Sequence, residues 1–125
     1  MKSQWIEYGG KKILLIDLSS FHDDMKGFEA ELNETIATIG QDMYKMPEHS
    51  TLVLVDLRET SMTQASNKLL SERVTDTKKY ILRTAVVGMT GIRKIFLDYF
   101  SRLSNAETGS FEEPEAAKKW LVKIL

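Results

Sequence analysis

Two short runs of consecutive apolar residues constrain the fold more than any other feature of the sequence. They are residues 13–18, which read ILLIDL, and residues 52–57, which read LVLVDL. A strand with one face in water alternates apolar and polar residues, whereas a strand covered on both faces is apolar nearly throughout. The two runs therefore predict two strands of a mostly parallel sheet that has helices on both faces.

A glycine pair precedes the first of these strands. Residues 4–8 and residues 11–18 can both form strands, and Gly9-Gly10 lies between them. Two-residue hairpin turns need positive φ values, which glycine adopts without steric cost. We therefore expect the fold to open with a β-hairpin.

Helical periodicity follows each predicted strand. Asp23 and Asp24 can cap a helix, because Asp side chains accept hydrogen bonds from free backbone amides at a helix start. The apolar residues that follow recur every three or four positions and form one stripe: Met25, Phe28, Leu32, Ile36 and Ile39. A second helix, half exposed, is predicted from residue 62 to about residue 80, where apolar residues are sparser.

The last third of the chain continues the alternation of strands and helices. We expect a strand at residues 84–87, a helix at residues 91–103, a short strand around Phe111 and a final helix that begins at Pro114 and buries Trp120. The predicted order is ββαβαβα(β)α. This is an α/β fold with a mostly parallel or mixed sheet of four to five strands.

Length and composition limit the classes of function. The chain has 125 residues, which fits a single domain at residues 1–125, and its formal net charge is −1. Basic residues are scattered among acidic ones, so we do not expect a nucleic-acid partner, which needs several Lys or Arg on one face. The sequence has no cysteine, which excludes thiolate nucleophiles and zinc sites with sulfur ligands.

The amino-terminal sequence bears on the cellular location. It reads MKSQWIEYGGKK and lacks the apolar run of a secretion signal or a membrane anchor. The longest apolar runs in the chain are far too short to span a bilayer. We therefore expect a cytoplasmic protein without a membrane span.

Four segments together resemble a known family. They are residues 8–18, residues 52–58, residues 85–88 and residues 111–121, which reads FEEPEAAKKWL. In this order and spacing the chain resembles the bacterial STAS-like domains related to the anti-sigma factor antagonists, in the branch also compared with CRAL-TRIO lipid carriers. The resemblance implies a STAS-like fold and a binding or regulatory module.

In the better-known antagonists a partner kinase phosphorylates a Ser in an Asp-Ser-Ser-Gly type turn after the third strand. This chain has Asp56-Leu57-Arg58-Glu59-Thr60-Ser61-Met62-Thr63 at the matching place, so it keeps the hydroxyls but lacks the Ser-Gly pair. Hydroxyls at a helix start usually cap backbone amides, and we favour this interpretation for Thr60, Ser61 and Thr63. The alternative is a phosphoacceptor, because a helix amino terminus tolerates negative charge.

Two carboxylates end the buried strands. Asp17 and Asp56 should meet at the carboxyl edge of the sheet, where α/β proteins place their ligand sites. A receiver domain would need a further acidic partner and a Lys after the last strand, which are missing here. We therefore expect both side chains to bond backbone amides of the loops behind the strands. No metal site, cofactor or catalytic residue is predicted.

Two further groups of residues are candidates for binding. The loop Gly88-Met89-Thr90-Gly91 is predicted to be a tight strand-to-helix turn that could hold a partner or a small anion. Leu97 and Phe100 lie beside the helical stripe that contains Phe96, so they are candidates for an exposed interface or for an apolar pocket. An interface there predicts a two-fold homodimer.

These observations favour a non-enzymatic module that binds another protein. The candidate docking surface is formed by the loops at residues 58–63 and residues 88–91. The alternative is a carrier or sensor for a lipid-like or other apolar small molecule, with a cavity lined by Phe96, Leu97 and Phe100 and by Met89.

Overall fold

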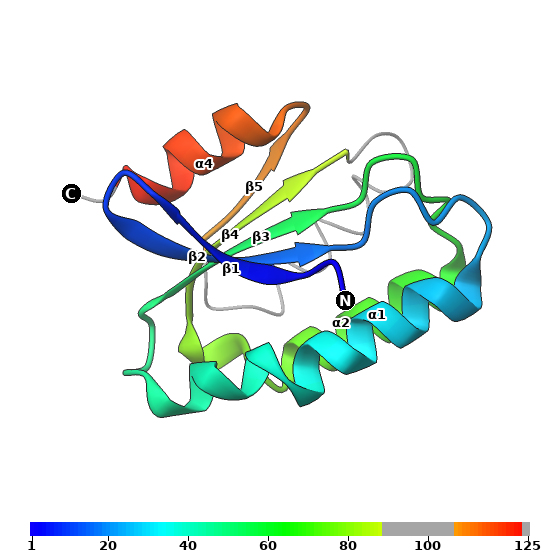
Figure 1. Ribbon diagram of the computed structural model, residues 1–125, viewed down its shortest axis with the longest axis horizontal. Coiled ribbons are helices and arrows are strands. Elements are labelled where there is room, and N and C mark those ends of the chain that lie inside the picture. The colour runs from blue at the N-terminus through cyan, green and yellow to red at the C-terminus, as the bar shows by residue number, and fades with distance from the viewer. Residues whose placement is uncertain (89–106, 124–125) are drawn as a thin grey trace.

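The computed structural model describes residues 1–88 and residues 107–123 of the chain (Figure 1). The elements in chain order are β1 (Gln4–Tyr8), β2 (Lys11–Asp17), α1 (Met25–Ala37), a 3-10 segment (Ile39–Lys45), β3 (Thr51–Asp56), α2 (Gln64–Thr75), a 3-10 turn (Lys78–Tyr80), β4 (Ile81–Val87), β5 (Glu107–Phe111) and α4 (Pro114–Val122). The helix predicted at residues 91–103 lies outside the described residues.

The five strands form one mixed sheet in the order β1-β2-β3-β4-β5. β1 is antiparallel to β2, and the other neighbours are parallel. Helices α1 and α2 lie on one face of the sheet and α4 lies on the other (Figure 1). The predicted α/β fold, with a mixed sheet and helices on both faces, is therefore confirmed.

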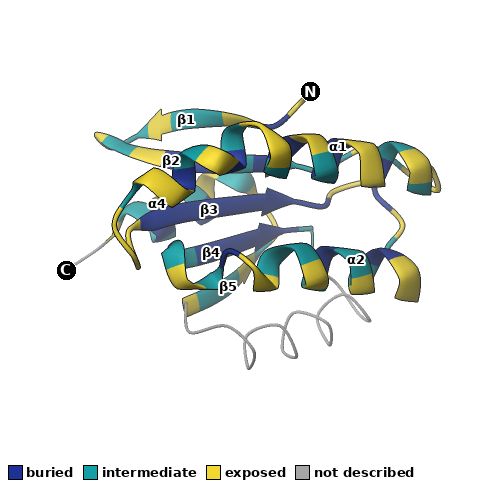
Figure 2. Cartoon of the chain, turned by 90° about the horizontal axis from the view of Figure 1, so that it is seen from below, coloured by how far each residue is buried: buried dark blue, intermediate teal, exposed yellow. Residues whose placement is uncertain are grey.

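The central strand β3 is buried over its whole length (Figure 2). Val53 and Val55 pack in the core under α1 and α2, whereas Leu52 and Leu54 pack in the core under α4. Because successive side chains of a strand point to opposite faces, an uninterrupted apolar run supplies both cores at once. This confirms the sequence-based interpretation of residues 52–57.

The hairpin and the first helix form where local sequence predicts them. Gly9 and Gly10 have φ values of +58° and +78°, which join β1 to β2 in a tight turn. Asp24 caps α1, because its carboxylate accepts a hydrogen bond of 2.9 Å from the Gly27 amide. Phe28 and Leu32 of the predicted stripe are fully buried.

The second predicted helix and the strand after it have different bounds in the structure. α2 ends at Thr75, a separate 3-10 turn follows, and β4 begins at Ile81, three residues before the predicted start. The pairing of β3 with β4 shifts register near the start of β4. Ile81 therefore packs under the helices while Leu82 packs on the α4 side, and this bulge hides the strand periodicity.

Arg83, near the start of β4, packs against α4 and β5. Its guanidinium lies 4.8 Å from the Trp120 ring centre and donates a hydrogen bond of 2.8 Å to the Trp120 carbonyl. Its Nε is 2.7 Å from the Glu107 carboxylate. Trp120 is half buried and packs against the core on the α4 side, so its predicted burial is partial. Ala117 and Leu121 are the fully buried residues of α4.

A buried carboxylate ties the chain start to α1. Glu31 is 7% exposed and accepts hydrogen bonds from the backbone amides of Lys2 and Ser3, at 2.8 and 3.2 Å. Burial by itself raises the pKa of Glu31. The hydrogen bonds from these amides and from the hydroxyls of Ser3 and Thr35 together lower the pKa by more than burial raises it, so it lies below its ordinary value. The ionised form of Glu31 therefore holds β1 against α1.

We predict that Phe28→Ala destabilises the protein more than Trp120→Ala. Phe28 is 1% exposed and packs edge to face on Phe21, so its truncation should cost about 3–5 kcal/mol of unfolding free energy. Trp120 is half buried, and its loss should cost about 2 kcal/mol. Urea denaturation of both variants checks this, and equal losses would show that α4 packs as tightly as α1.

The second prediction concerns pH. Because the pKa of Glu31 is lower in the folded than in the unfolded chain, its stabilisation is complete above the unfolded pKa and is lost as pH falls through the folded pKa. Glu31→Gln should be less stable than wild type at pH 7 by about 1–3 kcal/mol. The difference should shrink in denaturation curves recorded at about pH 3. A constant difference at both pH values would contradict the role of the charge.

Candidate docking site at the carboxyl edge of the sheet

The loops that follow β2 and β3 run side by side beyond the ends of these strands. The backbone amides of Leu18, Ser20 and His22 donate to the carbonyls of Asp56, Arg58 and Glu59 at 2.8–2.9 Å. The Ser61 amide returns a bond of 2.7 Å to the His22 carbonyl. The two loops, residues 18–24 and residues 57–63, therefore continue the parallel pairing of the sheet, and we call them the loop pair.

Three non-glycine residues of the loop pair have left-handed backbone conformations. The φ values are +60° at Ser20, +51° at His22 and +56° at Glu59. Such conformations are unfavourable for residues with a Cβ atom and persist only where the surroundings impose them. All three side chains are exposed, so the strained positions lie at the tips of the loops.

A buried hydroxyl joins the two loops from within. Thr60 is 2% exposed, and its Oγ1 donates to the Leu18 carbonyl at 2.6 Å. The same oxygen accepts a bond of 3.1 Å from the Phe21 amide. Thr60 therefore links the loops and is not a helix cap.

The helix cap of α2 is Thr63. Its Oγ1 accepts a bond from the Ser66 amide at 3.1 Å, and the Ser66 hydroxyl accepts one from the Thr63 amide at 2.7 Å. This reciprocal arrangement is a capping box. Ser61 is exposed and lies before the cap, so the capping role favoured for Thr60 and Ser61 is wrong and that for Thr63 is confirmed.

The strand-end carboxylates bond the loops behind their strands, as predicted. Asp17 accepts from the Ser19 amide at 3.1 Å and from its hydroxyl at 2.5 Å. Asp56 accepts from the Arg58 amide at 3.0 Å. Asp17 and Asp56 are paired in the register of β2 and β3. Each is also next to a cation, since Lys2 Nζ is 3.5 Å from Asp17.

The cation beside Asp56 is Arg58. Its Nη2 lies 2.8 Å from Asp56 Oδ2, and its Nε donates to Oδ1 at 3.1 Å. The hydrogen bond to the Asp56 carboxylate raises the pKa of Arg58, so the guanidinium stays charged. Asp56 is 6% exposed and holds the guanidinium of Arg58, while about half of the Arg58 side chain remains exposed to solvent.

Gly88 packs against the same loop. It has a φ of +88°, and a Cβ atom there would lie 2.9 Å from the Arg58 backbone nitrogen. Only glycine fits such a close approach. Six further candidate residues from the sequence lie outside the described residues: Met89, Thr90, Gly91, Phe96, Leu97 and Phe100.

The surface of the loop pair is open and polar. A hollow of about 430 Å³ is lined by Ser19, Ser20, Arg58 and Glu59. The Ser20 hydroxyl donates to the Glu59 carboxylate at 3.1 Å. The described residues contain no cluster of three or more potential metal ligands. None of the described helices is long and apolar enough to cross a membrane.

The strand order, the opening hairpin and the helices on both faces agree with the STAS-like fold of the SpoIIAA type that a solved structure shows. The structure is similar to the crystal structure of an uncharacterized DUF3478-family protein with a SpoIIAA-like fold, from Shewanella loihica PV-4. The TM-score is 0.71 over 95% of this chain and 91% of that chain, at 12% sequence identity. No family model and no curated protein sequence match the chain. The likeness to CRAL-TRIO carriers stays a prediction.

One half of the site was not predicted from the sequence. The sequence pattern predicted a docking surface at residues 58–63, and residues 18–24 were not connected with it. The repeated pattern was the available indication, because ILLIDL and LVLVDL both end in Asp-Leu. Equivalent ends of adjacent parallel strands place their following loops side by side.

The third prediction separates the three hydroxyls of the second loop. Thr60→Val should cost about 1–3 kcal/mol of unfolding free energy, because it leaves the Phe21 amide without its acceptor. Thr63→Ala should cost about 1 kcal/mol as a lost cap, and Ser61→Ala should stay within about 0.5 kcal/mol of wild type. Urea denaturation of the three variants measures these differences. A larger loss for Ser61→Ala than for Thr63→Ala would overturn the assignment of the cap.

Proposed function

We propose that this protein is a regulatory module that binds a partner protein through the loop pair and acts without catalysis. The observation that carries the proposal is the strain at the tips, where Ser20, His22 and Glu59 are held in left-handed conformations. Strained backbone clusters at functional sites, and binding residues often lie on loops positioned by a rigid scaffold. Loops held rigid before binding lose less conformational entropy when a partner docks.

The chemistry of the edge favours binding over a reaction. Both strand-end carboxylates are used for structure, since Asp17 and Asp56 bond loop amides and are paired with Lys2 and Arg58. The exposed hydroxyl, imidazole and charged groups of the tips suit polar contacts with a protein surface.

Ser61 is the residue at which a phosphate would act as a switch. Its side chain is exposed, whereas Thr60 is buried and bonded within the loop pair. A phosphate on Ser61 would place about two negative charges beside Glu59, and a partner contact that had been neutral would have to desolvate them. The expected effect is release of the partner with little change in folding.

The finer features of the proposal rest on residues outside the described ranges. The expected two-fold homodimer was inferred from Leu97 and Phe100. Residues 89–91 belong to the second loop of the expected docking surface. These features and the cytoplasmic location stay predictions. The alternative function is a carrier of an apolar molecule. It also stays a prediction, because it depends on a cavity that was expected beside Phe96.

The fourth prediction compares two glutamate substitutions. Ser61→Glu lies in the loop pair, and the matched control Ser50→Glu changes an exposed serine before β3, at the opposite edge of the sheet. Each tagged protein is incubated with lysate of its own cell, and the captured proteins are quantified by mass spectrometry. Ser61→Glu should reduce recovery of the wild-type partner by roughly 100-fold, because a buried charge costs several kcal/mol.

Melting curves complete this experiment. Both variants should melt within about 2 °C of wild type, because exposed substitutions barely change folding. Equal partner recovery from wild type and Ser61→Glu would show that the partner does not dock on the loop pair. Equal loss in Ser61→Glu and Ser50→Glu would show a general effect of charge and would also contradict the proposal.

A further inference from the structure

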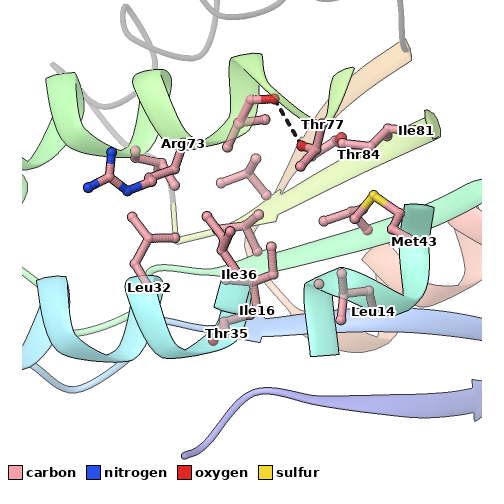
Figure 3. Close-up of a pocket in the computed structure, with 16 residues that line it drawn as sticks. Leu14, Ile16, Leu32, Thr35, Ile36, Met43, Arg73, Thr77, Ile81 and Thr84 are labelled. Carbon is pink, nitrogen blue, oxygen red and sulfur yellow. Dashed lines mark hydrogen bonds between the residues drawn. The ribbon is translucent and has the colours of Figure 1, made fainter. Parts of the chain in front are cut away.

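A cavity of about 40 Å³ lies between the sheet and helices α1 and α2 (Figure 3). It is on the face of the sheet covered by these helices and is separate from the loop pair. Its wall is mostly hydrocarbon, with Leu32 from α1, Met43 from the 3-10 segment, Leu70 from α2 and Val55 and Val86 from the strands. An occupant would therefore contact this wall mainly through its apolar atoms.

One hydroxyl in this wall stands out among the described residues because it is buried and unpaired. Thr84 of β4 is 3% exposed, and its Oγ1 has no partner among the described residues. The other two threonines of the wall are already bonded, since Thr35 donates to the Glu31 carbonyl at 2.7 Å and Thr77 to the Val74 carbonyl at 2.9 Å. Buried polar groups are normally paired, so the Thr84 hydroxyl is an unexplained feature of the cavity.

The bulge in β4 is the reason that Thr84 lines the cavity. The register of β3 and β4 shifts at the start of β4, and Thr84 and Val86 then line the face toward α2 together with Ile81. Figure 3 places Thr84 and Thr77 close to each other, and Arg73 lies away from them. The Thr84 hydroxyl therefore lies at a different part of the cavity wall from the Arg73 guanidinium.

Among the described residues that line the cavity, Arg73 is the charged one, and its Nε donates to Asn33 Oδ1 at 2.9 Å. The rest of the lining is hydrocarbon, glycine and threonine, and a charged group placed against it would lose its hydration without an ion partner. The occupant that fits beside Thr84 is therefore uncharged.

Water fits the cavity less well than an organic molecule does. The volume of about 40 Å³ exceeds the roughly 10–15 Å³ that a single water needs. A buried water, however, usually makes about three hydrogen bonds, and Thr84 offers the free side-chain hydroxyl of the described wall. A molecule with one oxygen and a short hydrocarbon part would use both the hydroxyl and the apolar wall.

We propose that this cavity binds a small neutral molecule of a few carbon atoms with one hydroxyl or carbonyl oxygen. The oxygen of the ligand hydrogen-bonds to Thr84 Oγ1, and its hydrocarbon part lies against Leu70, Val86 and the neighbouring apolar side chains. The ligand site lies under α2, and it is independent of partner docking at the loop pair.

The test uses 1-butanol and xenon as probes of the full chain. Methyl NMR spectra are recorded during titration with 1-butanol and under xenon pressure, with the methyl groups of Met43, Leu70 and Val86 as reporters. Both probes should shift these signals. Thr84→Val keeps the shape of the side chain and removes the hydroxyl, so it should keep xenon binding and weaken 1-butanol binding about fivefold or more.

A matched control is Thr51→Val. Thr51 is also a buried threonine, 3% exposed and on the neighbouring strand, but it does not line the cavity. This variant should bind both probes like wild type. A second readout needs no variant, because NOEs between the oxygen-bearing methylene of 1-butanol and the Thr84 methyl report the orientation of the bound alcohol.

Three results would overturn the inference. The first is that 1-butanol leaves the reporter methyl signals unshifted. The second is that Thr84→Val binds 1-butanol as tightly as wild type. The third is a water that remains bound at Thr84 at saturating 1-butanol, which would make the cavity a hydration site only. Should Thr84→Val fail to fold, absence of the NOE to the Thr84 methyl in wild type decides against the ligand.

Discussion

The burial of β3 on both faces is the constraint on which the rest of the structure depends. All six residues of the strand are buried, and its apolar side chains alternate between two cores. Each face therefore has to be covered by helices, α1 and α2 on one side and α4 on the other. The parallel neighbours of β3 follow from the same requirement, because the crossover between parallel strands supplies a covering helix.

The pairing of β2 with β3 also determines the candidate docking site. Backbone hydrogen bonds between the segments that follow β2 and β3 continue past the strand ends, and the buried Thr60 hydroxyl also joins the two loops. These bonds offset the unfavourable φ values at Ser20, His22 and Glu59. The exposed tips are thus attached to the most deeply buried part of the sheet, and this attachment supports the proposed docking surface.

The two faces of the sheet are packed differently. On the α4 side, Arg83 covers the Trp120 ring and Phe111 packs beside it, so polar and aromatic groups complete the layer. On the other side, the helices leave a cavity above β2, β3 and β4, with the hydroxyl of Thr84 in its wall. One bulge contributes to both arrangements, because it sets which side chains of β4 point to each face.

The sequence by itself determined the two buried strands, the glycine hairpin, the capped first helix and the final helix at Pro114, because each depends on residues close together in the chain. Tertiary structure decided the bulge in β4 and the partner of Thr60, which lies 42 residues away. It also left the hydroxyl of Thr84 without a partner among the described residues. It also decided that Thr63 rather than Ser61 caps α2. Local periodicity reports the face that a residue occupies, whereas hydrogen-bond partners and packing gaps depend on segments that meet only in the folded chain.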